Sequence, residues 1–183
     1  VENRTRFLRE IVEDSRKRIG DDIIICVRIS AEDFLEGGLE PEDYATIMPM
    51  LDEAGVDLWH VSVGTQTESF ERCTPIKELG EAPHIDIVTQ VKRYTRFPVI
   101  AVGGITSLKT AESILSEKKA DLIAIGRSQV ADQDFVRKSA EGKEDSIRKC
   151  LRCNRCCFWL HGENRMHCVV NPDYRKKKTK KTQ

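Results

Sequence analysis

The segments FPVIAVGGI (97–105) and ADLIAIGR (120–127) decide the fold of this chain. Each is a short apolar run, rich in β-branched residues, that ends in glycine, which is typical of a buried strand in a parallel sheet. Residues 107–118, between them, have the pattern of a helix. A strand, a helix and a second strand predict a right-handed βαβ unit, so both glycine ends lie at one edge of a sheet.

The same alternation extends toward the N-terminus. The segments IIICVRIS (23–30) and VDLWHVSVG (56–64) predict two further strands, and the near-continuous apolar run of the first suits burial on both faces. We expect helices at 2–19, 41–54, 83–96 and near 132–141, with a long polar connection at 65–82. Four βα units with glycine at the last two strand ends predict an α/β fold, half of a (β/α)₈ barrel with a phosphate site there.

The composition excludes several classes of protein. The chain has 183 residues, and its 39% hydrophobic and 33% charged residues are globular values. Lys and Arg equal Asp and Glu at 30 each, so no overall charge favours nucleic acid or a membrane surface. No apolar run approaches the roughly 20 residues of a membrane span, and the first residues are unlike a signal peptide. We therefore expect a cytoplasmic protein without a nucleic-acid partner.

Five of the seven cysteines lie in CLRCNRCCFWLHGENRMHC (150–168). This clustering favours a metal or iron–sulfur site in a reducing compartment over a framework of disulfides. Four thiolates at such spacing can hold either Zn²⁺ or a [4Fe–4S] cluster, and spacing alone does not choose between them. The third ligand can be Cys156 or Cys157.

Several segments together resemble one family, the flavin oxidoreductases of the old yellow enzyme superfamily. The likeness is closest to its iron–sulfur branch, which includes 2,4-dienoyl-CoA reductase and trimethylamine dehydrogenase. The segments that carry it, in family order, are ENRTRFL (2–8), VRIS (27–30), VDLWHVSVG (56–64), PVIAVGGI (98–105), ADLIAIGRSQVADQDF (120–135) and CLRCN…C…CVVNP (150–172).

The resemblance implies how the chain is organised. Residues 1–146 would form strands five to eight of an FMN-binding (β/α)₈ TIM barrel, and residues 147–172 a C-terminal [4Fe–4S]-binding loop. Residues 173–183, a lysine-rich tail, are expected to be disordered. We expect a missing N-terminal half-barrel, and a further C-terminal flavin or NAD domain that could hold FAD. Open strand edges also favour self-association.

The resemblance also implies the site residues. It places Arg28 beside the N1–C2=O edge of FMN, where a fixed cation stabilises the reduced flavin. The other expected FMN contacts, at the phosphate, are Gly103, Gly104, Gly126 and Arg127. The expected cluster ligands are Cys150, Cys153, Cys157 and Cys168, with Cys156 as the alternative third ligand.

The function implied is hydride transfer from NAD(P)H through FMN to an activated alkene, such as an enoyl or dienoyl thioester or an enone. The cluster would relay single electrons. The alternatives are amine oxidation with the same cofactors, or a non-catalytic zinc-binding α/β module. Dienoyl-CoA reductases carry a catalytic histidine just after the glycine that matches Gly64. This sequence has Thr65-Gln66-Thr67 there, so the catalytic residues stay unassigned.

Overall fold

The computed structural model describes residues 2–157 and 167–174. The chain divides into two compact units, which are described separately. Unit 1 comprises Val1–Pro75 and Leu79–Ala124, and unit 2 comprises Ile76–Glu78 and Ile125–Gln183. This division does not test the domain boundaries expected from the sequence, which stay predictions.

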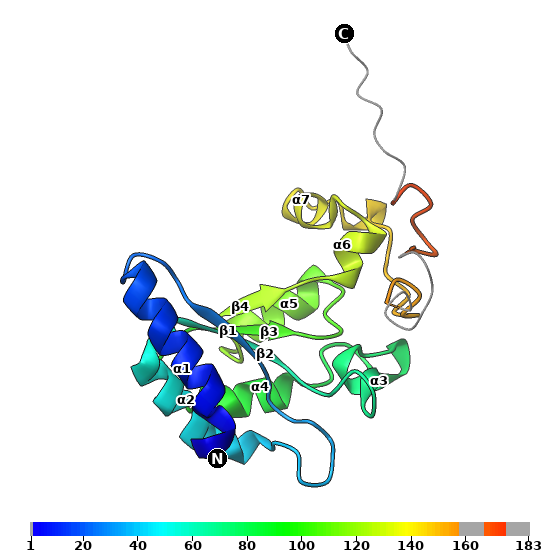
Figure 1. Cartoon of the computed structure of the whole chain (residues 1–183). Helices are drawn as coiled ribbons and strands as arrows, with labels where there is room; N and C mark the ends of the chain where they lie inside the picture. The colour runs from blue at the N-terminus through cyan, green and yellow to red at the C-terminus, as the bar shows by residue number, and fades with distance from the viewer. Residues whose placement is uncertain (1, 158–166, 175–183) are drawn as a thin grey trace. The chain divides into compact units, whose positions relative to one another are not determined.

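Unit 1 holds the sheet and the helices that connect its strands (Figure 1). Its elements are α1 (Glu2–Ile19), β1 (Cys26–Ser30), the 3₁₀ turn η1 (Pro41–Asp43), α2 (Tyr44–Ala54), β2 (Leu58–Ser62), α3 (Phe70–Cys73), α4 (Ile85–Lys92), β3 (Val99–Val102), α5 (Leu108–Ser116) and β4 (Leu122–Ala124). A second 3₁₀ turn, η2 (Lys77–Leu79), lies at the boundary of the units.

The four strands form one parallel sheet in the order β1-β2-β3-β4. Each strand pairs with the next strand along the chain, and a helical segment connects the two, as the βαβ pattern requires. The predicted fold class, half of a (β/α)₈ barrel, is confirmed. None of the described helices is long and apolar enough to cross a bilayer.

One face of the sheet is buried and the other is open. Val27 and Ile29 of β1 are buried, whereas Cys26 and Arg28, on the opposite face, are exposed. Trp59 and Val61 of β2 continue the buried face. The prediction that 23–30 is a strand buried on both faces is therefore wrong. Only alternate side chains of β1 pack against the rest of unit 1, and Ile23 and Ile24, which precede the strand, are 56% and 69% exposed.

Two aspartates hold the amino ends of the strands in register. Asp57, directly before β2, accepts the backbone N–H of Ile25 at 2.8 Å and pairs with Arg16 of α1. Asp121, directly before β4, accepts the backbone N–H of Val99 at 2.9 Å and pairs with Lys92 of α4 at 2.5 Å. The same arrangement, in which an aspartate joins a helix to two neighbouring strands, thus occurs twice in the chain.

Unit 2 begins with α6 (Arg127–Ala131), followed by α7 (Phe135–Ala140) and the 3₁₀ turn η3 (Glu144–Ser146). The helix expected near 132–141 is shorter than predicted, and α6 was not predicted. The strand expected over 120–127 ends at Ala124, so Arg127 begins a helix instead of ending a strand.

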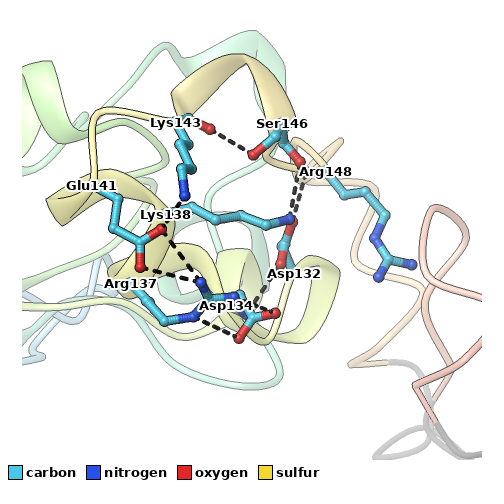
Figure 2. A network of polar contacts seen from close by, with 8 residues as sticks. All are labelled: Asp132, Asp134, Arg137, Lys138, Glu141, Lys143, Ser146 and Arg148. Carbon is cyan, nitrogen blue, oxygen red and sulfur yellow. Dashed lines mark hydrogen bonds and ion pairs between the residues drawn. The ribbon is translucent and has the colours of Figure 1, made fainter.

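Asp132 organises unit 2 (Figure 2). It is 1% exposed, and one carboxylate oxygen accepts Lys138 Nζ at 2.7 Å and the backbone N–H of Arg148 at 2.9 Å. The other oxygen accepts the backbone N–H of Asp134 at 3.1 Å. Burial alone would raise the pKa of Asp132, but these hydrogen bonds to the charged form hold the pKa below its usual value.

We expect Asp132→Asn to lower the free energy of unfolding by about 1–3 kcal/mol near neutral pH, because buried donors lose a charged partner. The unfolded-state pKa of Asp is about 3.9, and the folded-state pKa is lower. The stabilisation is therefore fully present above about pH 4 and is lost as pH falls through the folded-state pKa. Urea unfolding across this range should show the difference between the two proteins shrinking below about pH 4.

Asp134→Asn is the matched control. Asp134 pairs with Arg137, both side chains are more than half exposed, and such pairs contribute about 1 kcal/mol or less. Two outcomes would contradict the role of Asp132 as a buried, charged acceptor. One is an equal loss of unfolding free energy in Asp132→Asn and Asp134→Asn, and the other is a loss in Asp132→Asn that does not change with pH.

Candidate functional site

The open face of the sheet in unit 1 carries Arg28 and His60 on neighbouring strands, paired in register. Arg28 Nη2 donates a hydrogen bond to Ser62 Oγ at 3.3 Å. Burial, and then the charge of Arg28, lower the pKa of His60, so its ring is neutral near neutral pH. Its Nε2 is buried and finds no hydrogen-bond partner in the described chain. This face therefore presents the Arg28 cation beside a neutral, half-buried imidazole, and the cation is suited to a ligand with negative charge.

A glycine turn follows β3. Gly103 and Gly104 have φ values of 117° and 68°, a left-handed backbone that other residues rarely adopt. The carbonyl of Gly104 accepts the backbone N–H of Ala82 at 3.4 Å, which ties this turn to the loop before α4. The sequence identified this pair of glycines, and the turn explains why glycine is needed there.

Gly126, directly before α6, is a different case. Its φ is −105°, which any residue can adopt, and a Cβ atom added there would meet no atom within 4 Å. Glycine at this position leaves open space beside the backbone, where a ligand could approach.

Four cysteines of unit 2 line one small cavity of about 20 Å³. They are Cys150, Cys153, Cys156 and Cys168. Cys157, the expected third ligand, is not in the lining, and its Sγ lies 3.9 Å from Cys156 Sγ. Over residues 2–157 and 167–174, no three His, Cys, Asp or Glu side chains converge closely enough to hold a metal ion. The donor set nevertheless matches a four-thiolate site in kind and number.

The thiols of this cavity interact with one another and with Arg127. A hydrogen bond shared by Cys156 and Cys157 raises the pKa of Cys156 and lowers that of Cys157. Burial raises the pKa of Cys150, against the lowering effect of the Arg127 charge. A metal ion binds thiolates, so metal binding would release the thiol protons. The positive charge of Arg127 favours these thiolates.

Arg127 belongs to the wall of the cysteine cavity. Its guanidinium donates a hydrogen bond to Asn154 Oδ1. Asn154 is 4% exposed and has a φ of 58°, so a buried side chain fixes this left-handed residue between Cys153 and the next cysteine. The sequence predicted Arg127 as a phosphate contact only, and it did not identify Asn154.

Arg152 fixes the same loop from its other side. It is 7% exposed with a φ of 51°. Its Nη2 donates to the carbonyl of Lys77 at 3.1 Å, and its backbone N–H points to Cys150 Sγ at 3.4 Å. The LRCN sequence that follows Cys150 thus supplies two buried anchors, Arg152 and Asn154, which the spacing of the cysteines alone does not reveal.

The ends of the cysteine segment are joined outside the cavity. Arg148 Nη1 donates to Asn171 Oδ1 at 2.9 Å, and Asn171 Nδ2 donates to the carbonyl of Val130 at 3.0 Å. Asn171 is 3% exposed. Hydrogen bonds within the protein therefore close the segment against α6. The middle of the predicted cluster loop (158–166) and most of the predicted tail (175–183) lie outside the described residues.

Comparisons with known proteins identify the family of this chain. The NADH:flavin oxidoreductase / NADH oxidase family matches residues 1–146. An NADH oxidase of Thermoanaerobacter brockii is 36% identical over 173 residues, which are 93% of this chain and 26% of that protein.

Two solved structures are similar over 94% of this chain. One is a 2-naphthoyl-CoA reductase complex, with a TM-score of 0.86, 30% identity and 26% of that chain covered. The other is histamine dehydrogenase from Rhizobium sp. 4-9, with a TM-score of 0.83, 27% identity and 25% covered. The chain spans about a quarter of the length of these relatives. The resemblance seen in the sequence is confirmed, and the chain belongs to the NADH:flavin oxidoreductase / NADH oxidase family.

Proposed function

We propose that this chain is the part of a flavin oxidoreductase that binds FMN on the open face of its sheet and a [4Fe–4S] cluster in its cysteine cavity. The observation that carries the proposal is the cavity lined by four thiols in a chain of this family. When bound, FMN supplies hydride transfer and the cluster supplies single-electron steps.

Arg28 is the residue that we assign to the flavin ring. Its guanidinium is exposed on the open face, held by Ser62, and beside a neutral His60. A fixed cation stabilises negative charge that develops at a nearby ligand atom. We assign the FMN phosphate to Gly103 and Gly104 of unit 1, as the resemblance implies. Gly126 and Arg127, which belong to unit 2, stay predictions from the sequence.

We assign the cluster to Cys150, Cys153, Cys156 and Cys168. Cys156 replaces Cys157, the ligand preferred from the sequence, because Cys156 lines the cavity with the other three cysteines. Cys157, which hydrogen-bonds to Cys156, then accompanies the site as a fifth thiol. Arg127 and Asn154 support the loop that presents these ligands.

We propose that NAD(P)H is the hydride donor and that an activated alkene, such as an unsaturated thioester or enone, is the acceptor. The likeness to a 2-naphthoyl-CoA reductase supports this choice. The likeness to histamine dehydrogenase supports an alternative, the oxidation of an amine with the same cofactors. Turnover of an enone with NADH, against turnover of histamine with an artificial electron acceptor, separates the two.

We also propose that further βα units, or a second copy of this chain, cover the part of the open face that FMN does not occupy. Parallel sheets are almost always covered on both faces, and Leu122 of β4 is 47% exposed. Sedimentation over a range of concentrations would detect self-association of the chain.

The cysteine assignment predicts different outcomes for two neighbouring substitutions. We expect Cys156→Ser to lose most of the iron and acid-labile sulfide, because it removes a ligand, whereas Cys157→Ser keeps both. The measurement is metal and sulfide analysis after anaerobic purification, with the visible spectrum as a second readout. The opposite result would make Cys157 the third ligand, and stoichiometric zinc without colour in the unmodified protein would exclude the cluster.

The flavin assignment predicts that Arg28→Gln lowers the reduction potential of bound FMN, because the reduced, anionic flavin loses a cation. Arg28→Lys keeps the charge and should retain most of the potential. Arg18→Gln, at an exposed position of α1, is the control and should leave it unchanged. Spectroscopic titration with a reference dye measures the potentials. A potential unaffected by Arg28→Gln would place Arg28 away from the flavin.

A further inference from the structure

We propose that Arg72 forms an oxyanion-binding site at the carboxyl end of the sheet in unit 1, which takes a carboxylate or phosphate group of the substrate. This inference deepens the proposed function, since it supplies a contact for the charged part of that substrate. It depends on three contacts that fix Arg72 and on the lack of an acid paired with it.

The first contact fixes the backbone of Arg72. Arg72 lies in α3, which follows β2 in the chain. At Gly64, two residues past the end of β2, φ is 75°, and an added Cβ atom would lie 2.7 Å from the backbone nitrogen of Cys73 and 3.0 Å from Arg72 Cβ. Only glycine allows α3 to pack this closely against the end of the strand.

The second contact fixes the carbonyl group of Arg72. His84 is 5% exposed, and its Nε2 lies 3.1 Å from the Arg72 carbonyl oxygen. Burial is the main cause that lowers the pKa of His84, so the neutral ring donates its Nε2–H to this oxygen. A buried histidine thus ties α3 to the residue that precedes α4.

The third contact fixes the side chain. The guanidinium carbon of Arg72 lies 5.1 Å from the centroid of the Phe34 ring, and that ring lies 5.8 Å from the ring of His84. Phe34 has a φ of 57°, which is uncommon for a bulky residue and marks a conformation imposed by its surroundings. A guanidinium stacked on an aromatic ring keeps the N–H groups at its edge free to bind a planar oxyanion.

Within the described part of the chain, no carboxylate forms an ion pair with Arg72, whose side chain is exposed. Arg16, another well-fixed arginine of unit 1, pairs with Asp57. The charge of Arg72 lowers the pKa of Glu32, but burial and Glu40 raise that pKa overall, and the two residues form no ion pair. A cation held this firmly without an ion-pair partner is suited to an external anion.

The position of the site agrees with this role. Phe34 lies in the loop after β1, and Arg72 follows β2, so both belong to segments at the carboxyl ends of the strands. Ligands of parallel α/β sheets bind at this end. The anion can be a carboxylate of the substrate itself or a phosphate of a carrier attached to it, because both fit the guanidinium fork.

The chain contains a matched control. Arg96 is also exposed, and its guanidinium carbon lies 5.0 Å from the centroid of the neighbouring Phe97 ring. This pair has the same chemistry as Arg72 and Phe34, but it precedes β3 and so lies at the amino end of the sheet.

The experiment measures binding of benzoate, its neutral analogue benzamide, and inorganic pyrophosphate to the 183-residue chain by calorimetry. We expect Arg72→Gln to weaken anion binding about tenfold and Arg96→Gln to leave it unchanged. Benzamide should not distinguish these proteins. Arg72→Lys, which keeps the charge, should bind more tightly than Arg72→Gln, and Phe34→Leu should bind more weakly than the unmodified chain. Thermal unfolding identifies any variant that fails to fold.

A loss confined to benzoate supports a carboxylate of the substrate, and a loss confined to pyrophosphate supports the phosphate of a carrier. Equal anion binding by the unmodified chain and Arg72→Gln overturns the proposal, as does an equal loss in Arg96→Gln. If Arg72→Gln does not fold, the other two variants decide the test. The proposal is then overturned if Arg72→Lys and Phe34→Leu bind the anions as tightly as the unmodified chain does. The measurement needs neither flavin nor turnover, so its failure is distinct from a failure of the proposed function.

Discussion

The parallel sheet depends on a charged hydrogen bond that occurs twice, at Asp57 and at Asp121. Each aspartate directly precedes one strand, accepts a backbone N–H at the start of the neighbouring strand, and pairs with a cation from a helix. Parallel strands cannot be joined by a tight turn, so contacts of this kind add to the buried side-chain pattern in fixing their register. Because the amino ends are held in this way, the carboxyl ends can carry the loops that form the candidate site. Gly64, Gly103 and Gly104 all lie in such loops, each with a left-handed backbone.

Unit 2 uses the same principle to support its cysteines. Asp132 and Asn171 are almost fully buried, and both bind groups from segments that flank the cysteine loop. Inside the loop, Arg152 and Asn154 are buried in left-handed conformations between the first cysteines. The protein therefore organises much of the loop through its own hydrogen bonds. Folding therefore orders much of the ligand loop before a metal binds, so metal binding loses less conformational entropy.

Sequence patterns predicted the regular elements because their signals are local. β-Branched runs between glycines mark the four strands, and helices expected at 2–19 and 107–118 are present as α1 and α5. The patterns failed where packing decides the outcome. The apolar run at 23–30 looks buried on both faces, but only one face of β1 packs on the rest of unit 1, and α6 is too short for a periodic signal. The candidate cysteine ligands were also found from a local signal, the C-x₂-C spacing. The choice between Cys156 and Cys157 depends on which of them faces the other cysteines in the folded chain.

The sequence by itself determined the order of most strands and helices, and the thiols and glycines from which the candidate sites are built. These follow from periodicity and spacing, which are properties of neighbours along the chain, whereas the family follows from the resemblance of ordered segments to its members. Only the tertiary structure decided that Cys156 lines the cavity with the other cysteines, and that Arg127 bonds to Asn154, 27 residues away. It also decided that Arg72 rests on Phe34 and is held by His84. The physical reason is that such contacts join residues from separate loops, and their geometry arises only when the strands that carry those loops have paired.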